Sequence, residues 1–178
     1  MSSPKVPQFN PAVLPMEFRP RMGDVSDETH TKHYLIPGKV FVSAQSFAIS
    51  TIVGSGVAVC LWDSVHKIGG ANHFMLPEGP EHGENARRYG NVANPALLQR
   101  MLDLGADRRN LEARIFGGSI SGIHFGGEGE QLGERNANAA EHFLRTNGIR
   151  VVQNEIGGTH GRKVVFQTDD GKAWSEEL

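Results

Sequence analysis

The sequence contains a single cysteine, Cys60, among its 178 residues. One cysteine cannot form a disulfide within the chain, so we expect a protein of a reducing compartment, the cytoplasm. The chain also lacks an apolar run of about 20 residues, the length with which a helix spans a bilayer. Its N-terminus has no basic start followed by an apolar segment. The sequence therefore predicts neither a signal peptide nor membrane insertion.

An excess of charge of one sign is also missing. The 18 Lys and Arg residues nearly balance the 20 Asp and Glu residues, and the formal net charge is -2. Nucleic-acid binders usually carry a basic patch, so we expect no nucleic-acid partner. The eight histidines include no helical i, i+4 pair with a carboxylate between them. Without such a pair or a cysteine cluster, we expect no metal and no other cofactor.

The prolines are unevenly distributed. Five of the nine lie within the first 32 residues. Because proline is excluded from helix interiors and central strands, we interpret residues 1–32 as a proline-rich N-terminal extension. Residues 33–178 are long enough to bury one core and are expected to form a single domain.

Apolar alternation and turn residues predict more strands than helices. We expect strands at residues 39–43, 47–53, 57–62, 67–77, 111–116, 149–152 and 163–168, with a short last strand through Trp174. We expect two amphipathic helices, one from an Asn94 N-cap to Gly105 and one from Asn136 to Gly148. Two helices suffice to cover one face of a sheet, so the fold class is a layered α/β fold with mostly antiparallel strands.

Two segments are candidates for chemistry. Gly54-Ser55-Gly56 separates two apolar strands and is either a plain turn or bulge, or a loop that holds a ligand. A phosphate loop is disfavoured because neither a Lys-Ser/Thr pair nor a helix follows. His73 lies in an apolar strand and is either a buried core histidine or a general base.

These segments belong to a longer series of motifs. Gly54-Ser55 is followed by Val57-Ala58-Val59-Cys60-Leu61, and then by Gly69-Gly70-Ala71-Asn72-His73-Phe74-Met75-Leu76-Pro77. Further motifs are Phe116-Gly117-Gly118, Leu132-Gly133-Glu134-Arg135-Asn136 and Gly157-Gly158 before Gly161-Arg162-Lys163. In content and order this series closely resembles the chemoreceptor glutamine deamidases, the CheD family, from about Tyr34 to Trp174.

The resemblance implies a layered α/β/β sandwich and a Cys-His amide hydrolase. Its family removes ammonia from glutamine side chains of methyl-accepting chemotaxis receptors and also binds a CheC-type phosphatase of the chemotaxis response regulator. Carried onto this chain, the base is His73 and the supporting hydroxyl is Ser50. The nucleophile position, which holds cysteine in the family, is Gly56.

Gly56 is a departure from the family pattern. Hydrolysis through an acyl-enzyme needs a nucleophilic atom, which glycine does not supply. Loss of a nucleophile costs about 10⁶-fold in turnover in a well-studied protease. Cys60 lies about 13 Å further along an extended strand, and Ser55 would point to the opposite face. Two hypotheses follow: a deamidase with impaired activity, or a catalytically silent module that binds receptors or the phosphatase.

Overall fold

The computed structural model describes residues 30–120 and 131–178. Most of the expected N-terminal extension, residues 1–32, lies outside this part of the chain. The described residues form two α-helices, α1 and α2, and nine strands. The helices are α1 (Gly90–Asp103) and α2 (Leu132–Thr146). The strands are β1 (Thr31–Tyr34), β2 (Val40–Ser43), β3 (Phe47–Val53), β4 (Val57–Asp63), β5 (Ile68–Phe74), β6 (Leu111–Gly117), β7 (Arg150–Ile156), β8 (Arg162–Gln167) and β9 (Ala173–Glu177).

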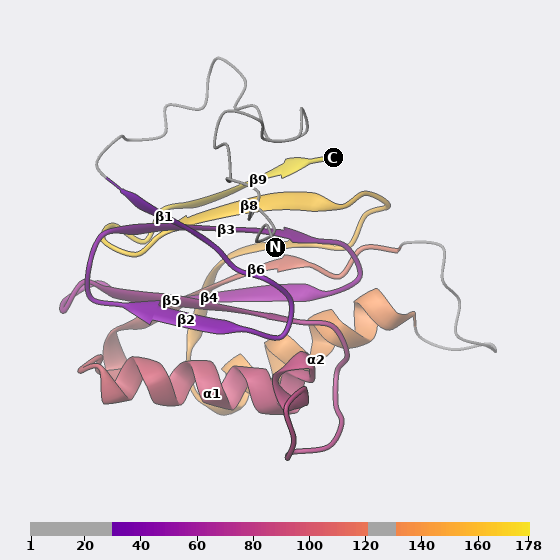
Figure 1. The fold of residues 1–178 in the computed structure, drawn as a ribbon, viewed down its shortest axis with the longest axis horizontal. Helices are drawn as coiled ribbons and strands as arrows, with labels where there is room; N and C mark the ends of the chain where they lie inside the picture. The colour runs from indigo at the N-terminus through magenta and orange to yellow at the C-terminus, as the bar shows by residue number, and fades with distance from the viewer. Residues whose placement is uncertain (1–29, 121–130) are drawn as a thin grey trace, which may run out of the picture.

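The strands form two stacked sheets with the helices on one side (Figure 1). The outer sheet has the order β1-β3-β8-β9, and the central sheet has the order β2-β5-β4-β6-β7. Five of the seven strand pairs are antiparallel, and β1–β3 and β6–β7 are parallel. The α/β/β layering and the mostly antiparallel strands confirm the predicted fold class.

The central sheet is buried on both faces. Strand β4, an apolar run in the sequence, has six fully buried residues out of seven. Its alternate residues Val57, Val59 and Leu61 pack toward the helices, in a core that also contains Leu97 and Leu144. Ala58 and Cys60 pack toward the outer sheet. This double burial explains why β4 reads as a continuous apolar run without alternation.

The first helix begins earlier than predicted. The sequence places an N-cap at Asn94, but α1 begins at Gly90, and Pro95 lies inside it. The first helical N–H groups are satisfied by the preceding loop, because Gly90 N donates to Leu76 O at 2.8 Å and Asn91 N to Pro77 O at 3.1 Å. Asn94 is instead buried and accepts a hydrogen bond from Asn72 Nδ2 at 2.8 Å.

Two further boundaries differ from the prediction. Strand β1 (Thr31–Tyr34) was not predicted, and it begins within the residues assigned to the extension. It pairs with β3 in parallel, a long-range partner that local sequence does not reveal. Helix α2 begins at Leu132, one turn before the expected start at Asn136. In the described residues, no helix combines the length and the apolar content that a membrane crossing requires.

Candidate active site

The Gly54–Gly56 segment connects β3 of the outer sheet to β4 of the central sheet, so it crosses one end of the sandwich. Backbone contacts fix it there. Gly118 N donates to Gly56 O and Ser119 N donates to Gly54 O, each at 2.9 Å. Gly117 has φ +113°, and a Cβ there would overlap the Gly56 carbonyl oxygen. Glycine at 117 is therefore required both by its backbone conformation and by the close approach of the two chains.

Asn136 of α2 holds this turn against the end of strand β5. Its side chain is fully buried, and Nδ2 donates to Ser55 O at 2.8 Å and to Met75 O at 2.9 Å. Ser55 precedes Gly56, and Met75 follows the strand that contains His73. One amide group thus fixes the spacing between the two segments that contain the predicted base and the predicted nucleophile position.

The structure brings Gly56 and His73 together. An ideal Cβ on Gly56 would lie 3.0 Å from His73 Nε2 and 2.9 Å from the Phe74 carbonyl oxygen. The φ of Gly56 lies outside the left-handed region, so a side chain is compatible with its backbone conformation. A side chain at position 56 would therefore begin in contact with the imidazole nitrogen of His73.

The hydroxyl bonded to His73 is that of Thr51 and not that of Ser50. Thr51 Oγ1 lies 2.9 Å from His73 Nδ1 and donates to the Leu35 carbonyl oxygen at 2.7 Å. Ile49, Thr51 and Val53 are buried on the inner face of β3, while Ser50 is only partly buried. Because neighbouring residues on a strand point to opposite faces, Ser50 lies on the side away from His73. The structure thus places the hydroxyl of Thr51, one residue after Ser50, against the imidazole.

The Thr51 contacts define the tautomer of His73. Its single hydroxyl proton is donated to Leu35, so Thr51 Oγ1 accepts from His73 Nδ1–H. The lone pair of His73 is then on Nε2, the nitrogen that faces position 56. Burial lowers the pKa of His73 to about 4, so the imidazole is neutral near pH 7. The free lone pair of Nε2 thus faces position 56, while a pKa of about 4 makes this imidazole a weak base in the absence of a partner there.

The structure shows the surroundings of Cys60 and Ser55, two other residues near this turn that carry a thiol or a hydroxyl. Cys60 is 1% exposed between the two sheets, and burial raises its thiol pKa to about 12. A thiol with such a pKa supplies almost no thiolate near neutral pH. Ser55 contributes its backbone carbonyl to Asn136. Among the described residues, no three His, Cys, Asp or Glu side chains gather closely enough to hold a metal ion.

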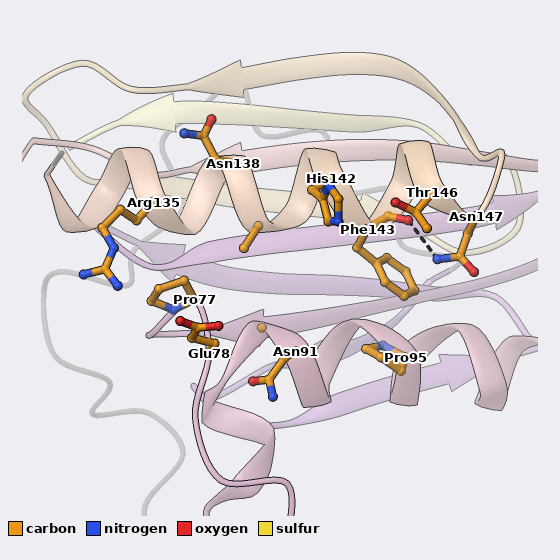
Figure 2. Close-up of a pocket in the computed structure, with 12 residues that line it drawn as sticks. Pro77, Glu78, Asn91, Pro95, Arg135, Asn138, His142, Phe143, Thr146 and Asn147 are labelled. Atoms are coloured by element: carbon orange, nitrogen blue, oxygen red, sulfur yellow. Dashed lines mark hydrogen bonds between the residues drawn. The ribbon is translucent and has the colours of Figure 1, made fainter.

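A groove of about 530 Å³ lies on the helical side of the molecule, between α1 and α2 (Figure 2). Asn91 and Pro95 of α1 face His142 and Phe143 of α2 across it. None of Thr51, Gly56 and His73 lines this groove. Its polar lining comes from both helices and from Glu78 of the loop after β5, so the groove does not include the site around His73.

Sequence reasoning missed Thr51 and Asn136. The alternation of β3 contained the signal for Thr51, because Ile49 and Val53 share its strand face and are apolar. Asn136 gave no comparable signal. The sequence pattern predicts a helix start at this residue, whereas Asn136 lies within α2 and bonds carbonyls 81 and 61 residues away in the sequence. Such contacts depend on how the layers pack.

Comparison with protein families gives one matching family model, described as CheD chemotactic sensory transduction. It matches residues 75–177. The match therefore begins two residues after His73 and covers Asn136 but not Gly56.

Curated relatives extend the similarity across most of the chain. A protein of Anaeromyxobacter dehalogenans, named probable chemoreceptor glutamine deamidase CheD 1, is 42% identical over 82% of this chain and 84% of its own length. Proteins named probable chemoreceptor glutamine deamidase CheD from Sulfurimonas denitrificans and Rhodospirillum rubrum are 36% and 39% identical. They are matched over 80% and 79% of this chain, and over 92% and 79% of their own lengths.

Proposed function

The chain belongs to the CheD family, and we propose that it recognises glutamine side chains of methyl-accepting chemotaxis receptors with impaired hydrolysis, because Gly56 occupies the nucleophile position. The observation that carries this proposal is the 3.0 Å separation between an ideal Cβ at position 56 and His73 Nε2. This separation supports His73 as the base and position 56 as the attachment point of a nucleophile, which the glycine side chain does not supply.

The proposed chemistry follows from what a cysteine at position 56 would do. Its thiol proton would pass to His73 Nε2, and the sulfur would attack the carbonyl carbon of a glutamine side chain. His73 would return the proton to the leaving nitrogen, which departs as ammonia, and water would then hydrolyse the thioester to glutamate. Thr51 is proposed to hold the imidazole in the Nδ1–H tautomer throughout. With Gly56, the first bond to the substrate cannot form.

A second candidate is a catalytically silent binding module that docks on receptors or on a CheC-type phosphatase in the cytoplasm. The inert Cys60 favours it, because this thiol is buried and has a pKa of about 12. The intact backbone frame around position 56 also favours retained binding, since Asn136 and Gly118 contact the turn through its carbonyls alone. The two candidates differ in residual hydrolysis, which can be measured.

The test measures ammonia release from a receptor cytoplasmic fragment by the full chain and by Gly56→Cys. We expect Gly56→Cys to exceed the parent by at least about 10³-fold, within the range seen when a nucleophile is removed. Gly56→Ala is the matched control, because it adds the same Cβ without sulfur. The Phe74 carbonyl, 2.9 Å from that Cβ, must shift by a few tenths of an ångström in both variants. Both should therefore lose similar stability, and only Gly56→Cys should gain activity.

Four outcomes test the proposal and its alternative. Release by the parent chain at the rate of Gly56→Cys contradicts impairment. Release by Gly56→Cys that persists after an added His73→Gln contradicts the role of His73. Receptor binding by the parent with no detectable release favours the silent module. If neither the parent nor Gly56→Cys binds the fragment, receptor recognition is wrong, and binding to the phosphatase becomes the remaining test.

A further inference from the structure

A second cavity lies at the far end of the sandwich from His73, between the edges of the two sheets. It has a volume of about 370 Å³. One wall is the turn between β8 and β9 with the start of β9, including Lys172, and the other contains Arg114 of β6 and Gln153 of β7. We call it the Arg114 cavity.

Arg114 is poorly compensated for a buried cation. The residue is 8% exposed and lies opposite Cys60 in the central sheet, on the face toward the outer sheet. Its ion pair is long, with Nη2 3.4 Å from Glu112 Oε2, and Glu112 also accepts from Arg150 Nη2 at 3.1 Å. Arg114 Nη1 is buried and has no hydrogen-bond partner among the residues that the structure describes. Buried guanidinium donors are normally paired, so this donor calls for a ligand or a water.

The surroundings add positive charge and a further unused donor. The Trp62 ring has Lys67 Nζ 4.8 Å and Arg114 Cζ 5.8 Å from its centroid. Trp62 Nε1 is also buried without a hydrogen-bond partner. The Lys172 side chain, 77% exposed, extends from the opposite wall of the Arg114 cavity. Two cations on facing walls thus flank one space between the sheets.

Asp170 is the acidic residue in the cavity wall, and its carboxylate is engaged by its own turn. Asp170 Oδ1 accepts from Lys172 N at 2.9 Å, and Oδ2 lies 3.9 Å from Lys172 Nζ. It therefore offsets the charge of Lys172 in part. Within residues 30–120 and 131–178, Asp170 does not bond to Arg114, whose Nη1 stays unpaired. The Arg114 guanidinium therefore lacks a negatively charged hydrogen-bond acceptor.

We propose that the Arg114 cavity binds a small oxyanion, a phosphate or a carboxylate group, between the Arg114 guanidinium and Lys172 Nζ. A planar guanidinium matches the geometry of two oxygens of such a group, and a charge-assisted hydrogen bond to it is stronger than one to water. Lys172 contributes a flexible point charge from the solvent side. The site needs no residue of the His73 region, so it is independent of the activity proposed there.

The test is thermal unfolding of the full chain in inorganic phosphate or in acetate, each against sodium chloride at equal ionic strength. At a concentration tenfold above Kd, the bound anion should raise Tm by about 3 to 6 °C. A rise in phosphate alone identifies a phosphate site, and a rise in both identifies a general oxyanion site. Arg114→Gln should abolish the rise, and Lys172→Gln should weaken anion binding several-fold.

A second variant and a measurement on the unmodified chain test the site even if Arg114→Gln does not fold. Lys172 is exposed, so Lys172→Gln should fold even if Arg114→Gln does not. In the unmodified chain, the Nε–H resonance of Arg114 should shift on phosphate titration and saturate with the same Kd as the Tm effect. The proposal is overturned if neither phosphate nor acetate exceeds chloride. It is also overturned if Lys172→Gln leaves the affinity unchanged or if the Arg114 resonance does not respond.

Discussion

The two ends of strand β4 pack against different kinds of group, mainly backbone at one end and side chains at the other. At the Gly56 end the walls are backbone: Gly117 lies directly against the Gly56 carbonyl, and Asn136 bonds two carbonyls. At the other end the walls are side chains, with the Trp62 ring packed against Gly171 and beside Arg114. The first end leaves little freedom of position, whereas the second retains donors without partners.

Backbone walls and side-chain walls differ in how far they can move. Backbone contacts fix atoms closely because a carbonyl cannot rotate away without moving its whole strand. Such rigidity suits a site that must hold a base and a nucleophile within contact distance. Side-chain walls adapt by changing rotamers, and they accommodate a ligand at lower cost. We therefore expect substitutions at the Gly56 end to be more damaging than matched substitutions at the Trp62 end.

The strongest test of this comparison is the pair Gly117→Ala and Gly171→Ala. Both glycines have positive φ, +113° and +70°, and in both a Cβ would overlap a neighbour. At Gly117 the neighbour is the Gly56 carbonyl, and at Gly171 it is the partly exposed Trp62 ring. We expect Gly117→Ala to lower the free energy of unfolding by about 4 kcal/mol and Gly171→Ala by about 2 kcal/mol. Urea unfolding measures both.

The same two variants can contradict the proposed difference in rigidity between the two ends of β4. Equal losses would mean that the indole ring is as immobile as the backbone, and the distinction between the two ends would be lost. A larger loss for Gly171→Ala would reverse it. Gly148→Ala is the control for backbone conformation alone, since Gly148 has φ +67° and a Cβ there would meet nothing within 4 Å.

The fold was predictable where a signal is local. The apolar run of β4 and the alternation of β3 gave both strands with nearly correct bounds. The start of α1 was not predictable, because carbonyls of the preceding loop satisfy its first N–H groups and no capping side chain is present. Strand β1 was not predictable either, because it pairs in parallel with β3, about 16 residues later in the sequence.

The candidate site was predictable in part. The family resemblance indicated His73 and Gly56, and the structure brings them into contact distance. It indicated Ser50 where Thr51 lies against the imidazole, a shift of one residue that reverses the strand face. The oxyanion donors in the Arg114 cavity had no motif, because Arg114 and Lys172 meet only through the stacking of two sheets.

The second prediction concerns pH and the burial of His73. Its pKa falls from the ordinary 6.5 to about 4 in the folded chain. Between these pH values the unfolded chain binds more protons than the folded chain. The contribution of neutral His73 to the free energy of unfolding is therefore fully present above about pH 6.5 and is lost as the pH falls toward 4. The expected loss from this residue is up to about 3 kcal/mol, measured by urea unfolding across that range.

Two variants isolate the contribution of His73. His73→Gln should remove this part of the pH dependence, so its curve is flatter than that of the parent between pH 6.5 and 4. His142→Gln makes the same change on the exposed surface of α2 and should keep the full drop. A parent curve that matches His73→Gln would show that His73 is hydrated when folded, which contradicts a closely packed Gly56 end.

The smallest expected effect comes from Asn136→Ala. This change leaves the carbonyls of Ser55 and Met75 without their Asn136 partner and should cost about 2 kcal/mol, whereas Arg135→Ala on the exposed surface of the same helix should cost less than about 0.5 kcal/mol. In the Gly56→Cys background, Asn136→Ala should also lower ammonia release by about 10- to 100-fold, because both bonded segments position reacting groups. A stability loss without this drop would make Asn136 a purely structural clamp. The backbone of residues 117–119 would then be sufficient to position the Gly56 end.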